Sequence, residues 1–240
     1  MKECMKKMNL NVFVVIVCSF LSIGLSSCNK DDDNDVVAPA EISYVSLYHA
    51  SPDASAIDVF LDERRVNYNP LRYTNFTSYL NFYAGERQMR VRPANAANVI
   101  IDTTFTFMKD QAYSLFYVNR LANIEALLVK DSLVAPTVGQ AAVRFIHLSP
   151  DAPAVDVMEM DESGTSLFAN QSYLQASDFK MIESGVQSFT ITVAGGSAPV
   201  LSIPDVNLVS GGVYTIIARG LVFPPAGNEN NLSVQIILNN

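Results

Sequence analysis

Two histidines are the residues of this 240-residue chain whose type and spacing first suggest chemistry. They are the only histidines, and after each one Ser, Pro and Asp follow at the same spacing, with a further Asp five residues later. An imidazole and a carboxylate can share a proton or bind a cation. The candidates are His49, Ser51, Pro52, Asp53 and Asp58 in the first pattern, and His147, Ser149, Pro150, Asp151 and Asp156 in the second.

A structural role for these residues is the interpretation that we favour. Before the second turn, Val143, Phe145 and His147 alternate with other residues like one buried face of a strand. Pro150 suits the second position of a tight turn, and Asp151 can bond the backbone ahead of it. A His and an Asp beside a turn commonly pair backbone groups that the turn leaves free. We therefore predict no catalytic residue, metal site or cofactor; a shared histidine site would require the two turns to face each other.

The repeat also predicts the domain organisation. The two patterns lie 98 residues apart in similar surroundings, which indicates two copies of one unit. In each copy, seven short strand-like segments are separated by turn residues. This predicts an all-β fold of two tandem immunoglobulin-like or transthyretin-like antiparallel β-sandwich domains. We place the first sandwich at residues 42–135, a linker at 136–140 and the second sandwich at 141–240.

The repeated pattern His-x-Ser-Pro-Asp-Ala-x-x-x-Asp-Val resembles the domain of unknown function (DUF) 4397 family. A small residue followed by glycine recurs before a later strand in both copies, at Ala84-Gly85 and at Ser184-Gly185. The resemblance covers residues 42–240 and implies a β-sandwich in an extracytoplasmic protein without an established activity. The second copy follows the pattern more closely, because Ser55 replaces the second proline in the first copy.

Residues 1–27 have the features of a lipoprotein signal peptide. Basic residues precede an apolar run that is too short for a comfortable membrane span. Leu25 to Cys28 resembles a bacterial lipobox, which implies that Cys28 is lipidated and begins the mature chain. An ordinary signal peptide with a chance cysteine is the alternative. The other two cysteines lie upstream of Cys28, so no thiol pair remains for a disulfide.

Residues 28–41 are expected to form an acidic tether, because the segment is too charged to pack. A calcium loop is the alternative, although the ligand spacing and central glycine of an EF-hand are absent. The run Lys30–Asp33 resembles an export signal of surface lipoproteins in Bacteroidetes-like bacteria. That resemblance implies an outer membrane lipoprotein exposed at the cell surface and held in the membrane by the lipid on Cys28.

The charge balance argues against a nucleic-acid partner. From Cys28 onward the chain has 13 basic and 23 acidic residues, whereas nucleic-acid binding needs a positive footprint. Arg90 and Arg92 share one face of a predicted strand. With Tyr79 and Tyr83 they could bind an acidic glycan or the carboxylates of a partner. We favour the alternative that these arginines pair with nearby acids or with the acidic second copy.

Together these features predict a binding protein rather than an enzyme. No phosphate-binding loop, nucleophile elbow or Cys/His metal spacing is present in the sequence. We expect a non-enzymatic surface lipoprotein that binds a glycan or protein ligand or mediates adhesion. A structural spacer or fimbrial-type assembly subunit is the alternative, and a polysaccharide-active enzyme is a third hypothesis.

The loop Phe223–Asn228 is a further candidate for contact with a partner. Because the first copy is neutral and the second acidic, we expect a weak, polar and salt-sensitive contact between them.

Overall fold

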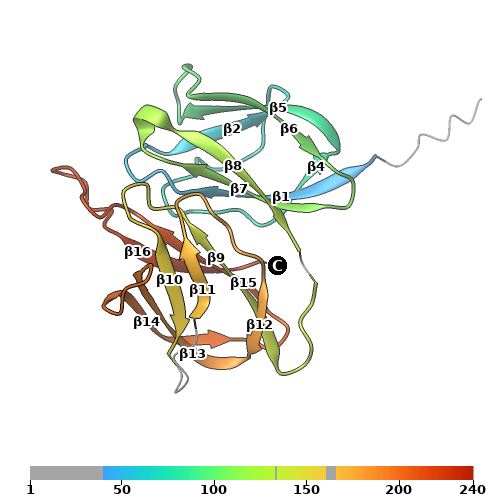
Figure 1. The fold of residues 1–240 in the computed structure, drawn as a ribbon. Coiled ribbons are helices and arrows are strands. Elements are labelled where there is room, and N and C mark those ends of the chain that lie inside the picture. Colours follow the sequence, from blue (N-terminus) through green and yellow to red (C-terminus); the bar gives the residue numbers. More distant parts are fainter. Residues whose placement is uncertain (1–39, 133, 161–165, 240) are drawn as a thin grey trace, which may run out of the picture. The chain divides into compact units, whose positions relative to one another are not determined.

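The computed structural model describes residues 40–132, 134–160 and 166–239. The predicted signal peptide, Cys28 and most of the predicted tether lie outside these residues. The described residues form sixteen strands and one short 3-10 helix, η1 (Leu121–Asn123), and Figure 1 shows how the strands are arranged. The all-β prediction is therefore confirmed. No helix among the described residues is long and apolar enough to cross a membrane.

The first copy forms a sandwich of two four-stranded sheets. We call the sheet with the order β4-β1-β7-β8 the first inner sheet and the sheet with the order β3-β2-β5-β6 the first outer sheet. The strands are β1 (Ile42–His49), β2 (Ile57–Leu61), β3 (Arg64–Arg65), β4 (Leu80–Tyr83), β5 (Gly85–Pro93), β6 (Ile101–Phe107), β7 (Ala112–Val118) and β8 (Glu125–Asp131). β1 and β7 run parallel, whereas the other pairs in both sheets are antiparallel.

The second copy repeats this arrangement. The second inner sheet has the order β12-β9-β15-β16, and the second outer sheet has the order β11-β10-β13-β14. The strands are β9 (Gln140–His147), β10 (Val155–Glu159), β11 (Ser166–Gln171), β12 (Lys180–Glu183), β13 (Gly185–Val193), β14 (Pro199–Leu208), β15 (Val213–Arg219) and β16 (Ser233–Leu238). β9 and β15 are parallel, as are their counterparts β1 and β7. The short strand β3 and the strand β11 are additions to the seven strands predicted for each copy.

Each sandwich encloses its own apolar core, as the alternation of side chains along the strands requires. In the first core, Val45 and Leu47 of β1 pack with Val59, Met89 and Leu115. In the second core, Val143 and Phe145 of β9 pack with Val157, Phe189 and Ile216. All of these side chains are at most 1% exposed. Two β-sandwiches with separate cores therefore agree with the predicted fold class.

A third apolar core lies between the two inner sheets. Its buried members are Tyr48, Ala50, Phe116 and Val118 from the first copy, and Ile146, Leu148, Ile217 and Ile237 from the second. The sheets thus stack in the order outer, inner, inner, outer (Figure 1). Residues 40–240 accordingly form one compact unit. The prediction of a weak, polar contact between the copies is wrong, because the charge of a whole copy does not reveal an apolar sheet face.

The prediction that β9 buries only one face is wrong for the same reason. One face of β9, with Val143 and Phe145, points into the second core, and the other face, with Ile146, points into the third. All seven residues of β7 are buried as well. The central strands of an inner sheet are covered on both sides, so both of their alternating sets of residues are buried.

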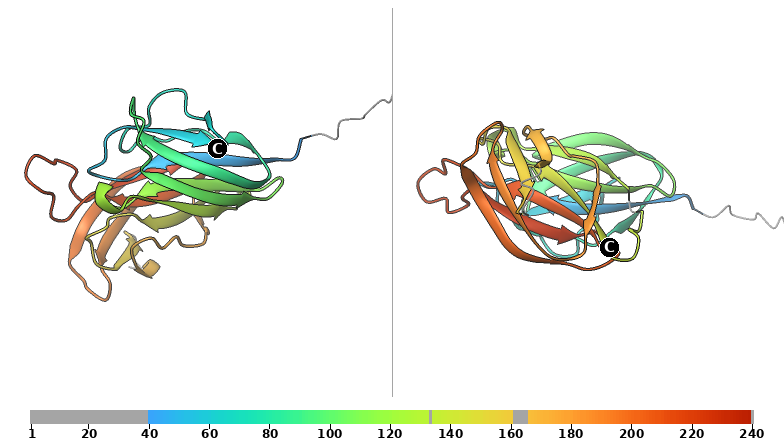
Figure 2. Two further views of the ribbon diagram at one scale, coloured as in Figure 1. Left: turned by 90° about the horizontal axis from the view of Figure 1, so that it is seen from above. Right: turned by 60° about the horizontal axis from the view of Figure 1, so that its bottom comes forward.

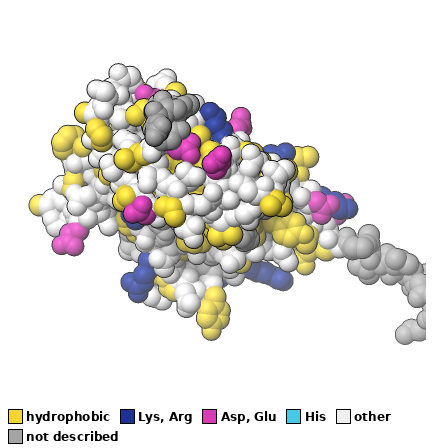
Figure 3. Space-filling model, turned by 90° about the horizontal axis from the view of Figure 1, so that it is seen from below, with side chains coloured by type: hydrophobic (Ala, Val, Ile, Leu, Met, Phe, Trp, Pro, Cys, Tyr) yellow, Lys and Arg dark blue, Asp and Glu magenta, His cyan; other side chains and the backbone are white. Residues whose placement is uncertain are grey.

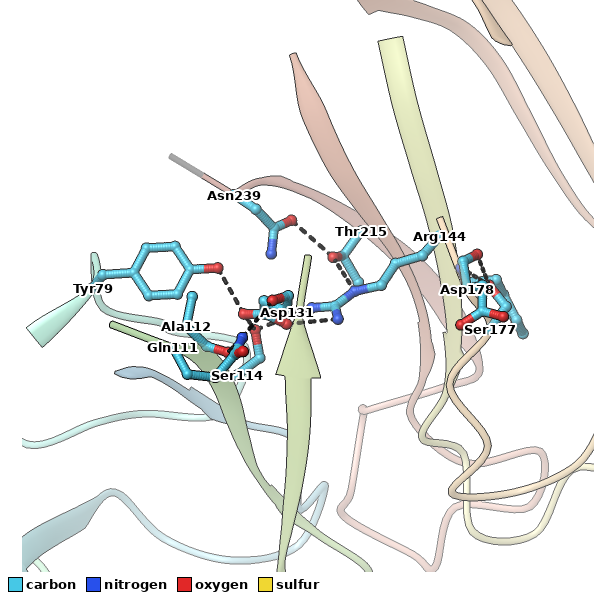
Figure 4. A network of polar contacts seen from close by, with 11 residues as sticks. Tyr79, Gln111, Ala112, Ser114, Asp131, Arg144, Ser177, Asp178, Thr215 and Asn239 are labelled. Atoms are coloured by element: carbon cyan, nitrogen blue, oxygen red, sulfur yellow. Dashed lines mark hydrogen bonds and ion pairs between the residues drawn. The ribbon is translucent and has the colours of Figure 1, made fainter. Parts of the chain in front are cut away.

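A buried polar network crosses the interface between the two inner sheets (Figure 4). Arg144 Nη1 of β9 lies 2.6 Å from Asp131 Oδ1 at the end of β8, and the two side chains are 1% and 0% exposed. Arg144 also donates to Ser114 Oγ at 3.1 Å and to Thr215 Oγ1 at 2.9 Å. Asp131 Oδ2 accepts further hydrogen bonds from Ser114 and Tyr79. Arg144 is therefore held by residues of both copies.

Candidate functional site

The two motif histidines bind the backbone of their own turns. His49 Nε2 lies 3.0 Å from the Ser55 carbonyl oxygen, and Nδ1 accepts a hydrogen bond from the Ser51 N–H at 3.3 Å. His147 makes the same pair of contacts, with the Pro153 carbonyl and the Ser149 N–H. Both side chains are 0% exposed. Since Nδ1 accepts and Nε2 faces a carbonyl, each imidazole is neutral with its proton on Nε2.

Burial of the two imidazoles has the expected electrostatic effect. Desolvation lowers the pKa of His49, and the bond to the Ser55 carbonyl offsets part of that effect. Desolvation likewise lowers the pKa of His147. Each ring also meets the edge of a tyrosine in its own copy, Tyr73 for His49 and Tyr173 for His147. Each imidazole thus makes its hydrogen bonds within its own copy, as expected of a residue that holds a turn. No histidine is visible on the face drawn in Figure 3.

The first motif aspartates tie each turn to the segment that follows the neighbouring parallel strand. Asp53 Oδ1 accepts a hydrogen bond from the Leu121 N–H at 2.7 Å. Asp151 Oδ1 accepts one from the Val222 N–H at 2.8 Å, and its Oδ2 accepts one from the Phe223 N–H at 3.1 Å. Because β1 and β7 are parallel, and so are β9 and β15, these turns and segments gather at one end of the strands. We call this the motif-turn end, made of residues 50–56, 119–124, 148–154 and 220–232.

The two copies also exchange contacts at the motif-turn end. Arg120 Nη2, which follows β7, lies 3.1 Å from Asp151 Oδ2 in the turn of the second copy. In the opposite direction, Asn228 and Asn230, which follow β15, both donate to the Pro52 carbonyl oxygen in the turn of the first copy. Each motif turn therefore contacts the loop of the other copy. The shared histidine site considered from the sequence does not fit this arrangement, because both imidazoles are buried and engaged locally.

Gly220 allows the loop at residues 220–232 to leave β15. Its φ of +88° lies in the left-handed region that favours glycine. A Cβ at this position would collide with the backbone carbonyl groups of Asn230 and Asn231. The Gly220 carbonyl accepts a hydrogen bond from Ser149 Oγ at 2.8 Å, which ties the loop to the second motif turn. In the first copy, Ser51 Oγ is buried without such a partner.

The second motif aspartates differ between the copies, although the sequence predicts one role for both. Asp58 is buried and lies 2.5 Å from Arg65 Nη2. Asp156 is only partly buried, and its carboxylate accepts hydrogen bonds from the N–H groups of Asn170 at 2.6 Å and Gly195 at 2.9 Å. These two N–H groups lower the pKa of Asp156. Asp156 therefore holds two backbone groups, as expected of an Asp beside a turn, whereas Asp58 pairs with a side chain.

This difference predicts unequal effects of the two alanine substitutions. Asp156→Ala should lower the free energy of unfolding by about 1 kcal/mol, because two backbone N–H groups lose a charged acceptor that water only partly replaces. Asp58→Ala should cost less, because Arg65 is 37% exposed and can be hydrated. Urea unfolding of the full chain measures both values. A loss at Asp58 equal to or above that at Asp156 would contradict this reasoning.

The predicted arginine and tyrosine cluster is not brought together. Arg90 and Arg92 lie on β5 of the first outer sheet, whereas Tyr83 lies on β4 of the first inner sheet. Arg90 pairs with Glu63 and Asp102. The guanidinium of Arg92 lies over the Phe60 ring at 4.7 Å.

The two tyrosines have different surroundings. The hydroxyl of Tyr79 donates to Asp131 between the copies, at 2.7 Å. Tyr83 is 60% exposed and lies beside Ile42, at the end of β1 away from the motif turn. Pairing of Arg90 with local acids therefore agrees with the interpretation favoured from the sequence.

An open groove separates the first motif turn from the long loop of the second copy. It has a volume of about 680 Å³ and lies between residues 52–55 and residues 225–230. Two exposed carboxylates, Asp53 and Glu229, line it. Phe223, in the same loop, is 76% exposed. The sequence identified the loop and Asp53 as separate candidates, but it could not show that they face each other across the repeat.

The described residues contain no group of three or more His, Cys, Asp or Glu side chains that could hold a metal ion. Figure 3 shows hydrophobic, basic and acidic side chains scattered over the face that it draws. The motif-turn end is the part of the described chain where the repeated residues, the loop at residues 220–232 and an open groove come together. We therefore treat the motif-turn end as the candidate functional site.

A comparison with protein families agrees with the family resemblance over part of the chain. Residues 43–158 match the model of the family described as "Domain of unknown function (DUF4397)". This match covers the first sandwich and the strand β9 of the second, and ends within β10. A comparison with curated proteins gives no match.

One similar solved structure is the crystal structure of CBMbc (family CBM26) from Eubacterium rectale Amy13K in complex with maltoheptaose. It is 11% identical, and the alignment covers 81% of this chain and 96% of that chain, with a TM-score of 0.25. A likeness at that TM-score carries no argument about this chain.

Proposed function

We propose that this protein is a lipid-anchored protein of the outer membrane surface that binds a partner without catalysis, through its motif-turn end. The ligand would be a glycan or a protein. The anchor would be the lipid on Cys28, and residues 28–41 would act as the tether. The proposed location rests on the resemblance of Leu25 to Cys28 to a lipobox and of Lys30–Asp33 to an export signal. The binding role rests on the arrangement of the described residues.

The observation that carries the proposal is the placement of the motif-turn end on the strands. β1 begins at Ile42, next to the segment that connects it to Cys28, and its other end leads into the first motif turn. The turns and the loop at residues 220–232 gather at that other end, and Figure 2 shows the loop (red) far from the start of β1 (blue) in both views. An anchored chain would therefore present these loops away from its attachment point, where a partner can reach them.

A pair of exposed aromatic residues at opposite ends of the strands tests the proposal. Phe223→Ala should lower partner binding about tenfold, because an exposed aromatic at a contact is a typical hot spot. Tyr83→Ala, at the other end of β1, is the matched control and should leave binding unchanged. Cells that display the full chain would be screened against arrayed glycans and proteins. Equal loss in both variants, or loss in Tyr83→Ala alone, would reject the motif-turn end as the binding site.

A structural spacer or assembly subunit is the second candidate function. The third core favours it, because apolar residues fix the two sandwiches to each other and make a stiff unit. A spacer would keep its role when Phe223 is changed. If partner binding is absent from the array and cell-surface complexes shorten or dissociate when the gene is deleted, the spacer function is correct and the binding function is wrong.

A further inference from the structure

The groove at the motif-turn end is acidic and lacks a cation of its own. Of the residues that line it, Asp53 and Glu229 are charged and none is basic. Asp53 uses Oδ1 to accept the Leu121 N–H, whereas its Oδ2 has no hydrogen bond or ion pair with any described residue. Arg120 is the basic residue beside Leu121 in the chain, but its guanidinium is paired with Asp151.

The second copy shows how the equivalent aspartate is used when a cation is available. Asp151 occupies the position in its turn that Asp53 occupies in the first turn. Its Oδ2 accepts a hydrogen bond from Arg120 Nη2 of the other copy at 3.1 Å, and the Asp151 side chain is 18% exposed. The same motif aspartate therefore binds a guanidinium group that arrives from outside its own sandwich.

Asp53 has no such guanidinium group beside it, and the loops that follow β7 and β15 differ at the corresponding position. The bonds from Leu121 to Asp53 and from Val222 to Asp151 make these two backbone positions equivalent. The residue before Leu121 is Arg120, whereas the residue before Val222 is Leu221, which is 0% exposed. The loop after β15 reaches the first turn with amide groups of Asn228 and Asn230 on Pro52 instead. Asp53 thus lines the open groove and has one carboxylate oxygen without a partner among the described residues.

We infer that this groove binds an arginine side chain presented by a partner protein, with Asp53 and Glu229 as the acceptors. A guanidinium group fits because its planar fork can donate to two oxygens at once, whereas an ammonium group acts as a point charge. The groove is shallow and open, so a side chain that projects from a protein surface can reach it. The inference rests on the proposed function, since it names the partner of the same motif-turn end.

Small probes on the purified full chain in detergent test this inference directly. Saturation-transfer NMR would compare the N-acetyl methylamides of arginine, lysine and citrulline, the last being a neutral analogue of arginine. The arginine probe should bind more tightly than the lysine probe, and citrulline should give no transfer. Asp53→Asn and Glu229→Gln should each weaken arginine binding about fivefold, as loss of one exposed ion pair does. Added salt should weaken it too.

The matched control is Asp110→Asn, which removes an exposed carboxylate beside the Ile42 end of β1. This variant should bind the arginine probe like the original chain. Equal transfer to arginine and citrulline, or unchanged binding in both Asp53→Asn and Glu229→Gln, would overturn the inference. The two proposals fail separately. If the arginine probe binds but Phe223→Ala does not change partner binding on cells, the proposed function alone is rejected. If Phe223→Ala lowers partner binding but the arginine probe does not bind, the arginine site alone is rejected.

Discussion

Replacing Arg144 with methionine should lower the free energy of unfolding by about 3–5 kcal/mol, the usual cost of removing one partner of a buried ion pair. In the original chain Arg144 Nη1 lies 2.6 Å from the Asp131 carboxylate, which is 0% exposed. The substitution removes this cation and leaves the buried carboxylate unpaired. Ser114 Oγ and Thr215 Oγ1 lose a donor at the same time. Urea unfolding of the full chain, followed by intrinsic tyrosine fluorescence, measures the change.

A double substitution separates the ion pair from the packing around it. Arg144→Met combined with Asp131→Leu should recover most of the loss, because apolar residues of similar volume often replace a buried pair at little cost. Arg90→Met is the matched control: Arg90 pairs with Glu63 and Asp102 at the surface, so little change is expected. If Arg144→Met is as stable as Arg90→Met, the pair does not hold the two inner sheets together.

Cys28→Ala should abolish attachment to the membrane and leave the protein soluble or unprocessed. The physical reason is that the proposal places the anchoring lipid on the Cys28 thiol, and the substitution removes that thiol. Fractionation and metabolic labelling with a fatty-acid analogue measure the change. Labelled protein that remains in the membrane after this substitution would contradict the lipidation of Cys28.

Replacing each residue from Lys30 to Asp33 with alanine tests the proposed surface-export signal. The protein should stay lipidated and membrane-bound, but external protease should no longer reach it. Unchanged cleavage of intact cells would remove the export-signal hypothesis and leave the anchoring hypothesis standing.

Local sequence patterns were sufficient to predict most of the strands and the motif turns. Strand alternation is a property of neighbouring residues, so the positions of most strands follow from apolar spacing and from turn residues such as Pro52 and Pro150. The repeat predicts two sandwiches because the same pattern folds in the same way twice. The contacts of His49 and His147 with their own turns are also local, since each spans six residues at most.

The relation between the two copies was decided by tertiary structure alone. An apolar residue in a strand is expected to be buried, but the sequence does not say which sheet covers it. Ile146 and Leu148 therefore gave no sign of a third core. Arg144 would be read as a solvent-facing residue, because its partner Asp131 belongs to the other copy. The groove between Asp53 and Glu229 likewise joins positions far apart in the chain. Such sites depend on how two folded faces pack, and the spacing of residues along one chain does not contain that geometry.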